Sequence, residues 1–193
     1  MPKPLLIFDF FGVVVEEVAH KWLYDHVEND VAKHIIATLF VREDLGEITA
    51  RQCFKELEKI TGVKAKQIEQ EWLNLGQLRQ DTYDFIIKNK DKYHIVLLSN
   101  ASASFINKFF VDEKINRLFK KKFISSELRM VKPDPQIFQY VLEHSNVNYS
   151  YAVMIDDNLV NIKAAQKIGL YGVHFTNMFE VSKQLEIIAK QEH

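Results

Sequence analysis

Short apolar runs and longer amphipathic stretches alternate along much of the chain. Five apolar runs have the length and composition of buried strands, at residues 5–8, 95–98, 123–124, 151–155 and 171–175. From about residue 81 onward, stretches with helical spacing separate these runs. Strands that alternate with helices in this way are typical of a parallel, doubly wound sheet. The pattern therefore predicts an α/β protein with a Rossmann-like core.

Polar residues at the ends of the helical stretches support this assignment. Ser102 and Asp134 are good N-cap residues, and Pro135 after Asp134 suits the first helical position. Gly169 is expected to end the helix that begins near Asn158.

The segment between the first two predicted strands has a different pattern. Residues 15–80 contain helical stripes, including an amphipathic stretch at 29–40, but no convincing strand. Thr49 and Gln52 form a capping box, and a stripe that includes Trp72 is closed by Gly76. We predict a helical cap at 15–80, inserted into a core made of residues 1–14 and 81–193.

Composition narrows the function classes. The chain has 193 residues, 47% of them hydrophobic, and a formal net charge of -1, so no polyanion-binding field is expected. The single cysteine, Cys53, excludes an internal disulfide and a cysteine metal cluster. No run reaches membrane-spanning length. We expect a cytoplasmic protein without nucleic-acid or membrane partners, and the oligomeric state stays open.

Polar side chains follow three of the predicted strands at the point where each strand ends. Asp9 follows the first run, Ser99 and Asn100 the second, and Asp156 and Asp157 the fourth. The carboxyl ends of parallel strands meet at one edge of a sheet, where ligands bind. Each of these residues could simply cap a helix, but only one of two adjacent acids can do so.

The chemistry of this set points to phosphate and a divalent cation. Three converging carboxylates repel one another unless a cation neutralises them, and an oxygen-only donor set suits Mg²⁺. Ser99 and the amides after it can hold anionic oxygens at a helix N-terminus. Lys132 adds a positive charge, and Pro133 and Pro135 make its surroundings rigid. Nucleophilic phosphoryl transfer requires such a set.

The chain resembles the haloacid dehalogenase-like (HAD) hydrolases over nearly its whole length. Four segments match the family's motifs in order and spacing: residues 8–14 (FDFFGVV), 97–100 (LLSN), 131–135 (VKPDP) and 155–161 (IDDNLVN). The helical insert resembles the family's first type of cap, which has a segment similar to residues 45–49 (LGEIT). The most similar members are sugar-phosphate phosphatases and the phosphatase domain of soluble epoxide hydrolase.

The resemblance implies a role for each matched residue. Asp9 would be the nucleophile that forms an aspartyl-phosphate, and Lys132 would neutralise Asp9 and the transferring oxygens. Ser99 and Asn100 would bind the phosphoryl group, and Asn161 would orient the fourth motif.

The resemblance also implies a metal site. Mg²⁺ would be held by Asp9, by the backbone carbonyl of Phe11 and by Asp157, with Asp156 binding it through water. The substrate would be a small phosphorylated metabolite, which the sequence does not name.

Phe11 departs from the family pattern. Family phosphatases carry an aspartate there, which protonates the leaving group and later activates water, a contribution of about 10²–10⁴-fold. Three interpretations follow. The first is a Mg²⁺-dependent phosphatase that is slow or restricted to good leaving groups. The second is a non-catalytic or regulatory protein that binds phosphate and metal. The third is a 2-haloacid dehalogenase-like hydrolase, against which the acid pair Asp156–Asp157 counts.

Overall fold

A computed structural model of the chain describes residues 2–192. Its centre is a five-stranded sheet in the order β3-β2-β1-β4-β5, in which every neighbouring pair is parallel. The strands are β1 (Lys3–Phe8), β2 (His94–Ser99), β3 (Lys121–Ile124), β4 (Tyr149–Asp156) and β5 (Tyr171–His174). All five coincide with predicted runs, so the predicted fold class is confirmed.

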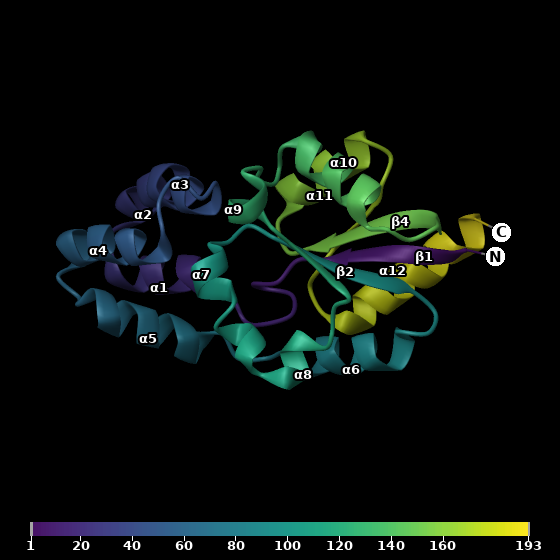
Figure 1. The fold of residues 1–193 in the computed structure, drawn as a ribbon, viewed down its shortest axis with the longest axis horizontal. Coiled ribbons are helices and arrows are strands. Elements are labelled where there is room, and N and C mark those ends of the chain that lie inside the picture. Colours follow the sequence, from purple (N-terminus) through teal and green to yellow (C-terminus); the bar gives the residue numbers. More distant parts are fainter. Residues whose placement is uncertain (1, 193) are drawn as a thin grey trace.

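Helices cover both faces of the sheet (Figure 1). On one face lie α10 (Pro135–His144) and α11 (Leu159–Lys167), and on the other lie α6 (Gln80–Asn89) and α12 (Met178–Gln191). The central strand β1 supplies both layers, because Leu5 and Ile7 belong to one apolar cluster whereas Leu6 and Phe8 belong to the other. A strand buried on both faces reads as a continuous apolar run.

Shorter helices connect the remaining strands. They are α7 (Ala103–Ile106), a 3₁₀ turn (Phe109–Val111), α8 (Glu113–Asn116) and α9 (Ser125–Leu128). The predicted N-cap at Asp134 is confirmed in full, and that at Ser102 in position only. The Asp134 side chain accepts a hydrogen bond from the Gln136 amide, with Pro135 at the start of α10. Ser102 occupies the N-cap of α7, but its side chain makes no capping hydrogen bond.

The segment between β1 and β2 is helical. It contains α1 (Ala19–His26), α2 (Asn29–Ile35), a π-helix (Ile36–Phe40), α3 (Val41–Asp44), α4 (Ala50–Thr61) and α5 (Ala65–Leu75). The Thr49–Gln52 capping box is present at the start of α4, as predicted. These helices gather at the end of the molecule opposite the two termini (Figure 1). We call residues 15–80 the helical insert.

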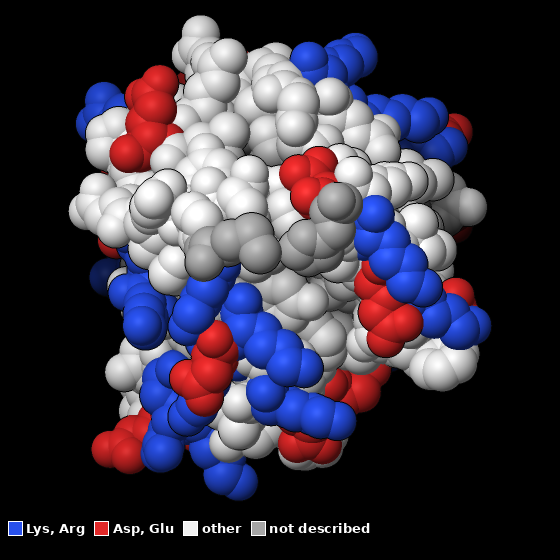
Figure 2. All heavy atoms as spheres, turned by 90° about the vertical axis from the view of Figure 1, so that its right-hand side faces the viewer, with Lys and Arg blue, Asp and Glu red and all other residues white. Residues whose placement is uncertain are grey.

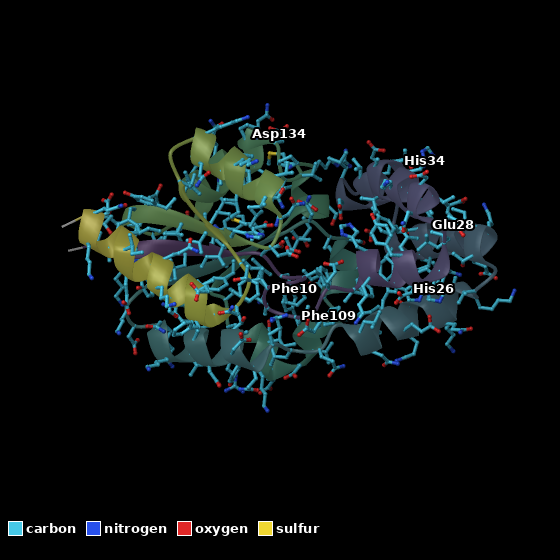
Figure 3. All side chains as sticks on the ribbon, turned by 180° about the vertical axis from the view of Figure 1, so that it is seen from behind. Phe10, His26, Glu28, His34, Phe109 and Asp134 are labelled. Carbon is cyan, nitrogen blue, oxygen red and sulfur yellow. The ribbon has the colours of Figure 1, made fainter. Side chains whose placement is uncertain are left out.

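Two antiparallel linkers connect the helical insert to the sheet. Val15 and Leu78 form an isolated antiparallel bridge, and the Glu16 amide donates to the Gln77 carbonyl at 2.9 Å. Aromatic rings fill the space beside the linkers. Phe10 and Phe109 meet there with ring centroids 5.6 Å apart, as Figure 3 shows between the sheet and the insert.

The outer surface is mixed in charge. Figure 2 shows the end that carries the termini, where Lys and Arg side chains gather over the lower half with Asp and Glu among them. No helix in residues 2–192 has both the length and the hydrophobicity of a membrane span.

Candidate active site

Asp9 comes directly after β1, at the carboxyl end of the sheet. Its amide donates to the Ile155 carbonyl at 2.9 Å, so its backbone continues the pairing with β4. The residue is nearly buried, and 13% of its side chain is exposed. Oδ1 accepts hydrogen bonds from the Phe10 amide at 2.7 Å and lies 2.8 Å from Lys132 Nζ. Both contacts therefore engage Oδ1, whereas Oδ2 has no hydrogen bond to any residue of 2–192.

Lys132 joins two buried carboxylates. Its Nζ lies 2.8 Å from Asp9 Oδ1 and 2.7 Å from Asp156 Oδ2. Burial acts to lower the pKa of Lys132, but attraction by Asp156 and then Asp9 outweighs it and holds the pKa above its usual value. The lysine is therefore a permanent cation at the centre of the site.

Asn100 fixes the backbone of this lysine. Its Nδ2 donates to the Lys132 carbonyl at 2.8 Å, and its Oδ1 accepts from the Lys132 amide at 2.9 Å. Ser99, one residue earlier, is fully buried, and its Oγ is a buried polar atom without a hydrogen-bond partner in residues 2–192. A buried hydroxyl normally has a hydrogen-bond partner, which the described residues do not supply here.

Asp156 and Asp157 are adjacent but have different surroundings. Asp156 is fully buried, and it accepts from Lys132, from the Asn158 amide at 2.8 Å and from Asn161 Nδ2 at 3.0 Å. Asp157 is exposed. Neither acid caps α11, because Asn158 does so through the Val160 amide.

The acidic residues form a group that fits a divalent cation. One carboxylate oxygen from each of Asp9, Asp156 and Asp157 lies within 4.8 Å of the other two. Gly12 has a positive φ of 82°, and a Cβ there would lie 2.3 Å from Asp157 Oδ2. Only glycine leaves room for that carboxylate beside the first motif. Hard oxygen donors of this kind suit Mg²⁺.

The electrostatics agree with a cation at this position. Burial raises the pKa of Asp9 well above its usual value, Lys132 opposes the shift, and Asp156 and Asp157 add to it. Asp157 is exposed as a whole residue, but its carboxyl group faces the cavity and is partly desolvated, which raises its pKa to about 6, with Asp156 adding to the effect. These carboxylates are strained by mutual repulsion that a bound cation would relieve.

Phe11 packs among other aromatic side chains. Its ring stacks on Phe105 at a centroid distance of 6.2 Å and meets Phe109 edge-on at 5.6 Å. Phe105 in turn meets Trp72 of α5 edge-on at 5.6 Å. The position of the family aspartate therefore belongs to an aromatic cluster that spans the core and the helical insert.

Asp9 lies at one wall of a cavity of about 350 Å³. Phe11, Asn100, Lys132 and Asp157 also line it, whereas Ser99 and Asp156 are fully buried and do not line it. A second wall comes from the helical insert and its linker, which lie beyond the end of the sheet (Figure 1). That wall is aromatic and acidic, and it includes Glu17, His20, Phe40, Glu43, Asp44 and Trp72.

The three acids of this wall, Glu17, Glu43 and Asp44, are not predicted as site residues from the sequence. Burial raises the pKa of Glu43 to about 8, and Asp44 adds to the shift, whereas hydrogen bonds with Ser102 oppose it. Burial raises the pKa of Asp44 to about 7, with Lys132 opposing and Glu17 adding. Glu43 and Asp44 come just before residues 45–49 (LGEIT), the segment that resembles part of the family's cap, and this is their only sequence signal.

The segment that carries these acids is fastened to the core. Ser125 Oγ donates to the Asp44 carbonyl at 2.7 Å and accepts from the Ala101 amide at 2.9 Å. Gly46 has a positive φ of 70°, and a Cβ there would lie 2.5 Å from the Ser126 carbonyl oxygen. The end of α3 thus rests on α9 and on the loop after β2.

Similar proteins agree with this architecture. A D-ribitol-5-phosphate phosphatase from Bacteroides thetaiotaomicron is 24% identical over 95% of this chain and 97% of its own. A HAD family enzyme from the same organism, crystallised with magnesium and inorganic phosphate, superposes with a TM-score of 0.72 at 25% identity, covering 92% of this chain and 96% of that one. A HAD-like hydrolase from Porphyromonas gingivalis gives a TM-score of 0.75 at 18% identity, covering 96% and 98%.

The family comparison covers most of the chain. The model of the haloacid dehalogenase-like hydrolases matches residues 4–169, which include all four motifs, the helical insert and the cavity. The chain belongs to the haloacid dehalogenase-like hydrolase family.

Proposed function

We propose that this protein is a Mg²⁺-dependent phosphatase that hydrolyses a small phosphate monoester through an aspartyl-phosphate on Asp9. The observation that supports this most strongly is the Lys132 bridge, which holds Asp9 Oδ1 and leaves Oδ2 without a partner in residues 2–192. An oriented carboxylate with one unengaged oxygen is suited to attack phosphorus. The named phosphatase and the magnesium–phosphate complex among the similar proteins support the same chemistry.

Each residue has a part in this proposal. Asp9 and Asp157, with the Phe11 carbonyl, would hold Mg²⁺, and Asp156 would bind it through water. The cation would neutralise the phosphoryl oxygens when bound. Ser99 Oγ would hold a phosphoryl oxygen, which gives its buried hydroxyl a partner. Asn100 would act mainly by positioning Lys132, since both ends of its amide bind the lysine backbone.

We also propose that the helical insert is a cap, with residues 15–80 covering a core of 1–14 and 81–193. The insert supplies one wall of the cavity that contains Asp9, which is where a cap must lie to exclude water and contact the substrate.

The test is phosphate release from a panel of aryl, acyl, alkyl and sugar phosphates, with Mg²⁺ or with EDTA. Turnover should require Mg²⁺ and should be lost in Asp9→Asn, which keeps the size of the side chain. Equal turnover of Asp9→Asn and wild type would reject the proposal.

A non-catalytic binding protein is the second candidate, and Phe11 is the observation that favours it. This candidate predicts that calorimetry detects Mg²⁺ and phosphate binding to a protein that releases no phosphate from any ester of the panel.

A further inference from the structure

Phe11 leaves the first motif without a proton donor, yet the cavity contains other carboxyl groups. In-line displacement at phosphorus puts the leaving oxygen on the side away from the nucleophile. Attack by Asp9 Oδ2 from the sheet edge therefore directs the leaving oxygen away from the sheet, toward the part of the cavity that the helical insert lines. That part contains Glu17, Glu43 and Asp44.

Two of these acids are already engaged. Glu43 is buried, and Ser102 lies close enough to its carboxyl group to lower its pKa. Glu17 Oε1 accepts from the His20 amide at 3.1 Å and lies 3.8 Å from the His20 ring nitrogen. Asp44 differs, because its carboxyl group makes no hydrogen bond or ion pair with any residue of 2–192 and still lines the cavity.

The position of Asp44 relative to the core is fixed. Ser125 Oγ ties the Asp44 carbonyl to the Ala101 amide, directly after Asn100. Gly46 adds a close backbone contact with Ser126. The cavity therefore has Asp9 and Lys132 on one wall and a half-buried carboxyl group on the other, joined by hydrogen bonds rather than by a free loop.

We propose that Asp44 is the general acid and base of this enzyme, in the role that Phe11 cannot fill. This inference rests on the proposed phosphatase function and assigns a second catalytic residue to the same cavity.

The protonation behaviour of Asp44 agrees with the assignment. Burial raises its pKa to about 7, Lys132 lowers it and Glu17 raises it. A carboxyl group with a pKa near the working pH can give up a proton in one step and take one back in the next. Its neighbour Glu43 is held in the neutral form at neutral pH by burial, which raises its pKa to about 8.

Asp44 gives up a proton in the first step and takes one back in the second. Asp9 Oδ2 forms a bond to phosphorus while the phosphorus–ester oxygen bond breaks, and the leaving oxygen takes the proton of Asp44 to give the free alcohol. A water molecule then attacks the aspartyl-phosphate, and the Asp44 carboxylate takes one of its protons. The bond between phosphorus and Asp9 breaks, which releases inorganic phosphate and restores both carboxyl groups. With this acid present, the substrate class includes monoesters of ordinary aliphatic alcohols.

The test compares alkyl phosphates with p-nitrophenyl phosphate, whose leaving group needs no protonation. Asp44→Asn should lower kcat/KM by about 10²–10³-fold for the best alkyl phosphate and less than about tenfold for p-nitrophenyl phosphate. Glu47→Gln is the matched control, because Glu47 is exposed on the same segment, and it should leave both rates unchanged. The double variant Phe11→Asp/Asp44→Asn should hydrolyse alkyl phosphates with a kcat/KM at least about tenfold higher than that of Asp44→Asn alone.

Two further measurements test Asp44 without the Phe11→Asp substitution. For the wild type, kcat/KM with alkyl phosphates should fall above about pH 7, where Asp44 loses its proton, and this fall should vanish in Asp44→Asn. Across a series of phosphates, the wild-type rate should depend only weakly on the pKa of the leaving alcohol.

The inference is overturned if Asp44→Asn slows both substrate classes equally or slows neither. It is also overturned if the wild type hydrolyses only p-nitrophenyl phosphate. Either result leaves the proposed function intact provided that turnover still requires Asp9. Turnover that persists in Asp9→Asn rejects the proposed function instead.

Discussion

The two walls of the cavity differ in how their charges are arranged. On the core wall, Lys132 pairs with both Asp9 and Asp156, and Asn100 and Asn161 complete the network. On the insert wall, Glu43 and Asp44 line the same cavity and form no ion pair with any residue of 2–192, and burial raises their pKa values. The core wall has a permanent cation, Lys132, that pairs with its carboxylates, whereas the acids of the insert wall form no such ion pair with residues 2–192 and exchange protons near neutral pH. This difference suits one wall to phosphoryl transfer and the other to leaving-group chemistry.

The largest effect is expected from removing the cation of the core wall. Lys132→Met leaves Asp9 and Asp156 facing each other, which should cost about 3–5 kcal/mol of unfolding free energy. Loss of the charge that faces the phosphoryl group should also lower kcat by about 10²–10³-fold. Urea denaturation and phosphate release measure the two effects.

Lys120→Met is the control, because Lys120 is exposed. It should match the wild type in both assays. A Lys132→Met variant as stable and active as the control would show that the core network is not what holds the site together.

The metal ligands provide the next test. Asp157→Ala should weaken Mg²⁺ binding in calorimetry by about 10–100-fold or more, because one hard oxygen donor is lost. Asp30→Ala, at an exposed acid in the helical insert, should bind as the wild type does. Equal affinity of all three proteins would remove Asp157 from the metal site.

The strand ends of the core wall could be predicted from sequence for a physical reason. Parallel strands buried on both faces are continuous apolar runs, so the polar residue after each run marks the edge where ligands bind. Asp9, Asn100 and Asp157 were found in this way, and the structure places all three at the cavity.

The insert wall could not be predicted in the same way. The amphipathic stretch at 29–40 does not continue as one regular helix, because α2 gives way to a π-helix at Ile36–Phe40 just before α3. A π-helical turn shifts the helical face, so spacing alone does not show which side Glu43 and Asp44 occupy. Their orientation depends on the contact of Gly46 with Ser126 and of Asp44 with Ser125.

A pH series tests the protonation difference between the walls. The pKa of Glu43 is raised from 4.5 to about 8 by burial, so the folded wild type binds a proton that the unfolded chain releases. Its contribution to stability is complete below about pH 4.5 and is lost as the pH rises to about 8. Glu43→Gln stays neutral, so it should gain about 3–4 kcal/mol relative to wild type between pH 5 and pH 9.

Chemical denaturation at each pH measures this gain. Glu47→Gln is again the control and should show a constant difference from wild type. A constant difference for Glu43→Gln would mean that Glu43 is ionised in the folded protein throughout, which removes the contrast between the walls.

The smallest effect concerns how the insert wall is held. Gly46→Ala and Gly62→Ala both put a side chain at a positive φ, 70° and 76°, but only the Cβ at Gly46 meets another backbone. Gly46→Ala should therefore cost about 1–2 kcal/mol more than Gly62→Ala and should raise KM as the wall shifts. Equal melting temperatures and KM values for the two variants would show that the Ser126 contact does not position the wall.

Trapping the phosphorylated enzyme tests most directly whether Asp9 is the nucleophile. The wild type is mixed with Mg²⁺ and p-nitrophenyl phosphate, quenched in acid during turnover and digested for mass spectrometry, with Asp9→Asn treated in parallel. We predict a phosphoryl group on the wild-type peptide that contains Asp9 and none on the variant. Steady release of phosphate with no phosphoryl group on Asp9, or equal release by the variant, would contradict the account.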